Sequence, residues 1–376
     1  MLLKVLKVST INPPAQTREV TEILHEAFNR EGIHSELMEK EAGKTNVVAR
    51  LNGSARGQTV AFNGHIDVVP PGEGWTDDPF EPRVIDMKVQ ARGASDMKSG
   101  VVAMAYSLIL LARSGARFSG CILYTAVADE ETGSSCGTRF LIESDVFRDV
   151  RWAVVGEPTA LNVEHGNRGV IWMDIVVEGV ACHAGRAYVG KNPITVASEL
   201  VTELNNLEFK MVNERFEVPV PSLTVTRVAG GIADNVVPQT CTLTVDRRLL
   251  PGESVSQAIQ EIEGRVQKVV GKRASVRCHV KTWWEPYYLD PAHPLVQAAY
   301  RSCQRVLGYG PELRCKGGAT DASHLYHLAG IPSVLLGPGE PSQSHVVGER
   351  VSLQKVEDAV EIYADLAMQL LGGEGS

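Results

Sequence analysis

Acidic and histidine residues stand where apolar, strand-like runs of the sequence give way to loops. His65 and Asp67 follow a run at 58–63, and their spacing of two lets both side chains point to one side of an extended chain. A second run ends in three consecutive carboxylates at 129–131, and a third ends at Glu157. Because ligands bind at the carboxyl ends of strands in open α/β sheets, these positions predict a functional site.

Asp96 and His345 complete the candidate set from two further loops. Asp96 lies just before a long apolar stretch, and His345 follows a strand-like run and a turn rich in glycine and proline. Each has an ordinary alternative, because aspartate commonly caps or begins a helix and a loop histidine needs no function. Together, two histidines and three carboxylates provide the ligand types that a pair of zinc-type ions requires.

The ligands divide evenly between two ions if one carboxylate is shared. With Asp96 as the bridge, one ion is held by His65 and Glu157. The other is then held by Glu131 and His345. Each ion has three protein ligands and a position left for a shared water, as catalytic zinc sites require.

Glu130 is left over next to a ligand and is the predicted general base. Two ions about 3.5–4 Å apart lower the pKa of a shared water and polarise a carbonyl group, and a neighbouring glutamate can take the proton. Asp67 is expected to accept the second N–H of His65. A solvated acidic loop is the alternative. Three adjacent negative charges beside an apolar strand are costly, however, unless cations compensate them.

Alternating helix-like and strand-like segments predict the scaffold. Strands are expected at 46–51, 58–63, 120–128, 151–155 and 333–336, and helices at 16–31, 99–114, 136–144, 294–307 and 353–371. This alternation is typical of an α/β fold with a mixed, mostly parallel sheet and flanking helices. The stretch between them has the order β-α-β-β-α-β, which is the ferredoxin-like pattern. We therefore predict a catalytic metal-binding domain from 1–169 and 283–376, with an inserted α+β domain at 170–282.

Composition excludes several other classes of protein. The chain of 376 residues suits two domains, and its net charge of -8 argues against a nucleic-acid partner. The sequence contains no run of 18 apolar residues, so no membrane span is expected, and no signal peptide is recognised in the first residues. Seven scattered cysteines without a CxxC pair favour free thiols in a reducing cytoplasm. No GxGxxG or P-loop follows a strand, which argues against a nucleotide-binding protein.

Ordered motifs make nearly the whole chain similar to the family of acetylornithine deacetylases, succinyl-diaminopimelate desuccinylases, aminoacylases and glutamate carboxypeptidases. The motifs are GHIDVVP, RGASDMKSG, ADEETGS, GEPT, CHAG, GGIADNVVP, DRRLLPGE, GGATDAS and SHVVGE. The resemblance implies the ligand and base assignments given above, with two divalent ions per chain, zinc by preference and cobalt or manganese as substitutes. It also implies a cis peptide bond between Asp96 and Met97.

The resemblance assigns the inserted domain the roles of lid and dimerisation domain. His183, in CHAG, would reach across a homodimer to stabilise the oxyanion that forms during hydrolysis. A surface histidine is the alternative for His183. Asn235 and Gly318 would line the substrate site.

Arginines are the candidates for binding a substrate carboxylate. Arg247 could hold it through two parallel hydrogen bonds, although a strand-end arginine in an ion pair is an equal alternative and Arg248 competes for the role. Arg168, in GNRG, is a further candidate of the same kind.

The implied reaction is hydrolysis of an amide bond in an N-acyl amino acid or small peptide-like substrate with a free carboxylate. A carboxypeptidase or dipeptidase is the alternative within the same chemistry. A non-catalytic metal-binding relative is a third hypothesis. Glu130 and every predicted ligand are present, which argues against it.

Departures from the family pattern reduce the range of expected substrates. The sequence after GGATD is ASHL, without the arginine that desuccinylases carry near Ser323. Acetylornithine deacetylases tend to have a glutamate near the position of Asp321. Ala91 and Ser99 replace glycines, and the last motif reads HVVGE where relatives often have a proline and an acidic or amide residue. The missing arginine near Ser323 argues against diaminopimelate desuccinylation, and the residue at position 321 argues against acetylornithine deacetylation. The changes at Ala91 and Ser99 are tolerable within the family pattern.

Overall fold

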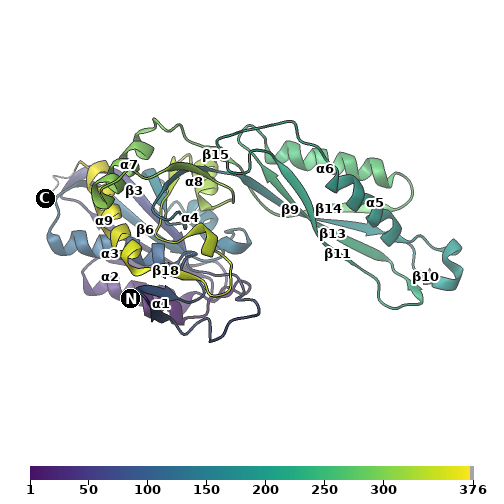
Figure 1. Ribbon diagram of the computed structural model, residues 1–376, viewed down its shortest axis with the longest axis horizontal. Coiled ribbons are helices and arrows are strands. Elements are labelled where there is room, and N and C mark those ends of the chain that lie inside the picture. Colours follow the sequence, from purple (N-terminus) through teal and green to yellow (C-terminus); the bar gives the residue numbers. More distant parts are fainter. Residues whose placement is uncertain (373–376) are drawn as a thin grey trace. The chain divides into compact units, whose positions relative to one another are not determined.

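The chain folds into two compact units, as a computed structural model describes for residues 1–372 (Figure 1). Unit 1 takes Met1–Gly166, Leu289–Arg314 and the chain from Thr320 onward, and unit 2 takes Asn167–Tyr288 and Cys315–Ala319. The insert expected at 170–282 falls within the longer segment of unit 2, whereas no sequence pattern indicates the short second segment.

A twisted mixed sheet forms the centre of unit 1, with the strand order β1-β2-β6-β3-β7-β17-β8. These strands are His34–Glu39 (β1), Thr45–Asn52 (β2), Ala55–His65 (β3), Ser119–Val127 (β6), Val150–Val155 (β7), Val163–Asn167 (β8) and Ser333–Leu335 (β17). β3 pairs in parallel with β6 and β7, and β7 pairs in parallel with β17. β1, β2 and β8 pair antiparallel at the two sides. The predicted mixed sheet with a parallel centre is confirmed.

Helices cover the sheet because its central strands are apolar on both faces. They are Leu2–Lys7 (α1), Arg18–Arg30 (α2), Lys98–Ser114 (α3), Thr138–Glu143 (α4), Pro294–Leu307 (α7), Asp321–Ala329 (α8) and Leu353–Leu370 (α9). α3 is buried around most of its circumference and packs against α9, whereas α2 buries one apolar face with Val20, Leu24 and Phe28. α3 is therefore a core helix.

A small antiparallel sheet in unit 1 has the order β18-β5-β4, formed by Arg350–Ser352, Lys88–Gln90 and Arg83–Ile85. It joins the chain that precedes Asp96 to the chain that follows His345. The short strand β16, Leu313–Lys316, spans the point at which the chain leaves unit 1 for Cys315–Ala319.

Unit 2 has the predicted β-α-β-β-α-β order and an antiparallel sheet ordered β11-β13-β9-β14. Its elements are Gly169–Glu178 (β9), Pro193–Asn205 (α5), Ser222–Gly230 (β11), Thr240–Leu249 (β13), Val255–Val270 (α6) and Ser275–Trp284 (β14). α5 and α6 lie on one side of the sheet (Figure 1), where Leu200, Leu243 and Ile262 share one core. The short strands β10, Cys182–His183, and β12, Val236–Val237, pair separately, and β15, Tyr287–Tyr288, ends the segment.

Two further sequence expectations concern cysteines and membranes. The seven cysteines all lie among the described residues and are free. Within residues 1–372, every helix is too short or too polar to cross a bilayer.

Candidate active site

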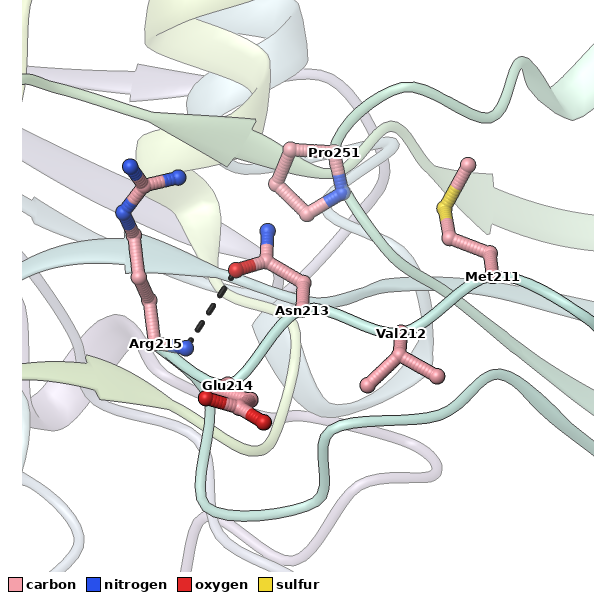
Figure 2. A pocket seen from close by; sticks show the side chains of 6 residues that line it. All are labelled: Met211, Val212, Asn213, Glu214, Arg215 and Pro251. Carbon is pink, nitrogen blue, oxygen red and sulfur yellow. Dashed lines mark hydrogen bonds between the residues drawn. The ribbon is translucent and has the colours of Figure 1, made fainter.

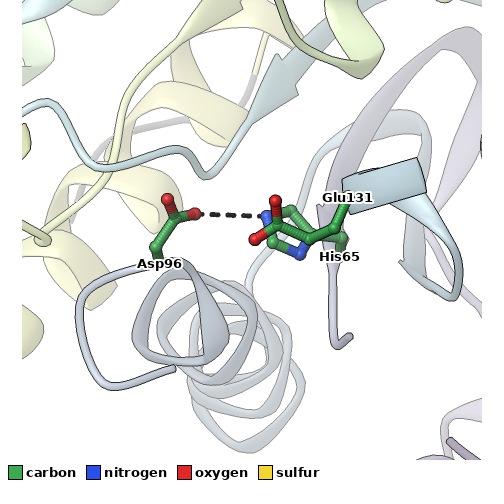
Figure 3. A group of neighbouring side chains, drawn as sticks. All are labelled: His65, Asp96 and Glu131. Carbon is green, nitrogen blue, oxygen red and sulfur yellow. Dashed lines mark hydrogen bonds and ion pairs between the residues drawn. The ribbon is translucent and has the colours of Figure 1, made fainter. Parts of the chain in front are cut away.

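Three side chains from separate segments meet at the carboxyl end of the central parallel strands. His65 ends β3, Asp96 precedes α3, and Glu131 lies in the short 3-10 turn Glu130–Thr132 after β6. Their ligand atoms lie within 4.8 Å of one another, and Nε2 of His65 is 3.2 Å from Oδ1 of Asp96 (Figure 3). An imidazole nitrogen and two carboxylates are ligand types that zinc takes, so this group fits a metal ion.

His345 lies next to two members of this group, Glu131 and Asp96. Its Nε2 lies 3.2 Å from Oε1 of Glu131 and 3.6 Å from Oδ2 of Asp96. The two carboxylate oxygens of Asp96 therefore face different histidines, which is the arrangement that a bridging ligand needs. His345 has a φ of +63°, a left-handed conformation that is rare for residues other than glycine and is often found at functional sites.

Glu130 is a buried carboxyl group beside this cluster. Burial raises its pKa well above the usual value, and the charges of Glu157, Asp321 and Glu131 raise it further, while His65 opposes them. Glu157, just after β7, is also buried, and its charge acts on Glu130 within the same neighbourhood. A carboxyl group with a raised pKa can accept and return a proton near neutral pH, which is what a general base needs.

A close approach of two backbones brings the Asp96 loop next to Glu157. Gly100, in the first turn of α3, lies so near Gly156 that a Cβ atom on it would stand 2.1 Å from the Gly156 carbonyl oxygen. Any side chain at Gly100 would therefore push α3 away from the end of β7. This contact explains the glycine at that place in the sequence.

Asp67 holds both the first ligand and the turn that carries the base. Nδ1 of His65 lies 2.9 Å from the main-chain oxygen of Asp67 and 3.6 Å from its Oδ1, so the shorter contact is with the carbonyl group. The buried carboxylate of Asp67 accepts hydrogen bonds from the backbone N–H groups of Glu130 and Glu131, each at 3.1 Å, and from Nδ2 of Asn12 at 2.8 Å. The sequence predicted the carboxylate of Asp67 as the partner of His65, whereas the shorter contact is with its main-chain oxygen. The sequence did not indicate the contacts with Asn12 or the turn.

Asp129 does not share the role of its two neighbours. It has a φ of +70°, which aspartate tolerates better than most residues, and its carboxylate accepts from Oγ1 of Thr132 at 2.7 Å and Oγ of Ser135 at 2.8 Å. Nζ of Lys44 lies 3.3 Å away. Asp129 therefore shapes the turn, which separates its negative charge from Glu130 and Glu131.

Asp321 adds a buried carboxyl group that sequence reasoning treated only as a departure from the family pattern. At the start of α8 it accepts hydrogen bonds from the hydroxyl groups of Ser134 and Thr138. Burial raises its pKa to about 6, although these two hydrogen bonds act in the opposite direction. Its position in the motif GGATDAS was the available signal.

His183 and Asn235 lie close together in unit 2. The main-chain N–H of Ala184 donates to the Asn235 carbonyl oxygen at 2.8 Å, next to the short pairing of β10 with β12. His183 is exposed, and its Nδ1 accepts the N–H of Gly185 at 3.0 Å. A neutral imidazole with an accepting Nδ1 carries its proton on Nε2, so this ring presents an N–H donor.

Arg247 and Arg168 are both buried in unit 2 but differ in their partners. Arg247 makes an ion pair with Glu253, donates to the Arg248 carbonyl oxygen at 2.5 Å, and stacks 4.0 Å from the ring centre of Phe209. Arg168 donates from Nη2 to the Val220 carbonyl oxygen at 3.0 Å, and its buried Nε has no hydrogen-bond partner among residues 1–372. Gly318 belongs to the short segment Cys315–Ala319 of the same unit.

A separate pocket of about 610 Å³ lies in unit 2 (Figure 2). It is lined by Met211, Val212, Asn213, Glu214, Arg215 and Pro251. The main-chain N–H of Arg215 donates to Oδ1 of Asn213 at 3.3 Å. This lining has neither a metal-ligand set nor a buried acid, in contrast to the cluster in unit 1.

Comparison with known proteins identifies the family. The model of peptidase family M20/M25/M40 matches residues 61–369. The chain belongs to this family. A succinyl-diaminopimelate desuccinylase of Acinetobacter baylyi is 30% identical over 321 residues, covering 82% of this chain and 83% of the relative. A desuccinylase of a Ruegeria species is 28% identical and covers 98% and 94%. This M20 protein is a hydrolase that acts on amide bonds, a metallopeptidase or amidohydrolase by family.

Solved structures share the fold over nearly the full chain. The M20 metallo-carboxypeptidase of Sulfolobus solfataricus has a TM-score of 0.83 at 18% identity, with 97% of each chain covered. Human carnosine dipeptidase 1 has a TM-score of 0.78 at 17% identity, covering 98% of this chain and 95% of its own. A dinuclear metal binding M20 peptidase of Bacillus subtilis has a TM-score of 0.73 at 19% identity, covering 99% and 97%.

Proposed function

We propose that this M20 hydrolase cleaves the amide bond of an N-acyl amino acid or a small peptide that carries a free carboxylate. The observation that carries the proposal is the position of Asp96, whose two oxygens face His65 and His345 while a buried Glu130 lies in the same cluster. A shared carboxylate and an adjacent base are the parts that two-metal hydrolysis requires. The desuccinylase relatives, which are amide hydrolases by name, support the same reaction class.

Two divalent ions per chain are proposed to occupy the cluster, zinc by preference, with cobalt or manganese as substitutes. His65 and Glu157 would hold one ion, Glu131 and His345 the other, and Asp96 both. When bound, such a pair lowers the pKa of a water molecule and polarises a substrate carbonyl group. The family match and the dinuclear relative support this assignment.

The chain's own residues then position groups and move one proton. Glu130 takes the proton at its carboxylate and passes it to the leaving nitrogen, and Asp67 keeps the turn that carries Glu130 in place through two backbone N–H groups. His183 donates from Nε2 to the developing oxyanion, because its Nδ1 is already an acceptor. We propose that unit 2 acts as lid and dimerisation domain, so that this histidine comes from the second protomer.

Exposed apolar side chains in unit 2 support a homodimer. Tyr188 is 84% exposed and Ile232 is 83% exposed, and Val189 and Val228 are exposed as well. Apolar groups of this size that remain in water often mark a protein interface. The free cysteines are in keeping with a cytoplasmic protein.

Arg168 is the better candidate for the substrate carboxylate. Arg247 already has an ion-pair partner in Glu253, so a substrate would have to displace a buried carboxylate. Arg168 has a buried guanidinium N–H without a partner among the described residues, and a donor of this kind costs free energy until it is paired. A carboxylate placed there would satisfy it through a charge-assisted hydrogen bond.

The proposal is tested by stripping the purified chain with a chelator, adding back zinc, cobalt or manganese, and measuring free amine released from N-acetyl and N-succinyl amino acids and dipeptides. Glu130→Gln should bind metal as the wild type does while kcat falls by about 10²–10⁴-fold, the usual contribution of a general base. Glu143→Gln, a surface carboxylate that pairs with Lys40, is the matched control and should keep full activity. Full activity of Glu130→Gln would refute the assignment of the base.

A further inference from the structure

Glu349 is a buried carboxylate outside the proposed ligand set that contacts the loop carrying Asp96. Its Oε1 accepts the backbone N–H groups of Ser95 at 2.7 Å and of Asp96 itself at 2.9 Å. Its Oε2 accepts the backbone N–H of Gly93 at 2.9 Å and Nη1 of Arg92 at 2.7 Å. The side chain of Glu349 is 0% exposed, so its carboxylate is satisfied by these groups of the protein.

The geometry of these contacts is that of an anion held by a curved backbone. Backbone N–H groups that converge in a loop form a concave site for a negative charge, and Glu349 fills this one from within the chain. Arg92 supplies the compensating positive charge and is itself buried, with Nη2 donating to the Pro71 carbonyl oxygen at 3.0 Å. Charge-assisted hydrogen bonds of this kind are about twice as strong as neutral ones.

The position of Glu349 in the chain connects two ligand segments. It follows His345 by four residues, and its own main-chain oxygen accepts the N–H of Ala91 at 3.0 Å. The segment that carries His345 is therefore fastened to the segment that carries Asp96 through both the backbone and the side chain. Asp96 must point one oxygen toward each histidine, so the relative placement of these two segments decides whether both contacts form at once.

We propose that Glu349 is a positioning residue that clamps residues 93–96 and thereby sets the affinity of the metal centre. The inference rests on the proposed two-metal function, but the clamp itself is a property of the metal-free chain. Outer groups that orient metal ligands usually change metal affinity by about 10–100-fold when they are lost.

Replacing Glu349 by glutamine distinguishes loss of the hydrogen bonds from loss of packing volume. Glu349→Gln keeps the size of the side chain but places an NH2 group opposite two N–H donors, whichever way the amide turns. At least two of the four hydrogen bonds are then lost, and buried donors remain without an acceptor. Glu340→Gln is the matched control, because Glu340 lies in the same segment, pairs with Lys355 and is partly exposed.

The experiment compares the full-length wild type, Glu349→Gln and Glu340→Gln, each stripped of metal. Zinc affinity is measured by competition with a chromophoric chelator, and exchange of the Ser95 and Asp96 amide protons is followed by mass spectrometry. We expect Glu349→Gln to bind zinc about 10–100-fold more weakly and to lose protection at both amides, with Glu340→Gln like the wild type. Wild-type affinity in a folded Glu349→Gln would overturn the proposal.

Three other outcomes are possible in this experiment. If Glu349→Gln does not fold, Glu349→Asp keeps the charge on a side chain one methylene shorter, and it should show weakened zinc binding with the same loss of amide protection. Unprotected Ser95 and Asp96 amides in the metal-free wild type would overturn the clamp directly. A wild type that binds no divalent ion would instead refute the proposed function, and the clamp would then be decided by amide protection alone.

Discussion

His324, on α8, is a buried histidine whose effect on stability can be predicted from its surroundings. It is 1% exposed. Burial, together with smaller contributions from the charges of Arg139 and His327, lowers its pKa from 6.5 to about 3. The folded chain therefore keeps this ring neutral at pH values where the unfolded chain protonates it.

The sign of the pH dependence follows from this difference in bound protons. Between pH 6.5 and 3 the unfolded state binds more protons at His324, so the free energy of unfolding falls as the pH is lowered through this range. At pH 5 the loss is about 2 kcal/mol, and below pH 3 it reaches about 5 kcal/mol, at about 1.4 kcal/mol for each pKa unit. Asp321 acts in the opposite sense, because its pKa is raised to about 6 and its contribution is lost as the pH rises.

The assay is urea unfolding of the metal-free chain between pH 5 and pH 7.5, for the wild type and for His324→Gln. The substitution removes the titrating ring but leaves Asp321 in place, so the difference between the two curves isolates His324. We expect the variant to gain about 2 kcal/mol relative to the wild type between pH 7.5 and pH 5. His34→Gln, at an exposed histidine on β1, should run parallel to the wild type. Parallel curves for His324→Gln would show that the buried ring is not kept neutral.

Three further predictions concern the proposed reaction. Mixing equal amounts of Glu130→Gln and His183→Ala should restore about a quarter of wild-type activity, because half of the dimers are mixed and each mixed dimer has one intact site. Mixed dimers that regain no activity would argue that His183 does not act across the interface. Arg168→Met should raise KM more than it lowers kcat, whereas an equal effect of Arg247→Met in a folded protein would remove the distinction between the two arginines. Adding zinc in excess to stripped protein should raise the melting temperature with metal concentration, and a constant melting temperature would contradict binding to the folded state.

The central fold could be predicted because its strands and helices have strong local patterns. β3, β6 and β7 are short apolar runs that end in polar residues, and α3 and α9 are long enough to be recognised from the sequence alone. α8 was missed, because its residues Asp321–Ala329 include several polar side chains that are buried through hydrogen bonds with other segments. Short strands such as β4 and β5 are stabilised by their pairing partners, so they have little signal of their own.

The contrast between strong local patterns and long-range contacts also explains which parts of the site could be predicted. His65, Glu131 and Glu157 follow neighbouring parallel strands, β3, β6 and β7, and such strands end at one edge of a sheet. Their proximity therefore follows from strand order. Asn12 could not be found in this way, because its contact with Asp67 joins residues 55 positions apart and no local pattern indicates it.

The positions of the proposed ligands Asp96 and His345 depend on contacts between loops rather than on the sheet. Both lie in loops, so their placement depends on the hydrogen bonds that those loops make with each other. The structure assigns that task to Glu349, which accepts the backbone N–H groups of Gly93, Ser95 and Asp96 from a position four residues beyond His345. A ligand at a strand end is placed by the sheet, whereas a ligand in a loop needs a partner of its own. For this reason, substitutions at Glu349 should affect Asp96, the proposed shared ligand, before they affect His65 at the end of β3.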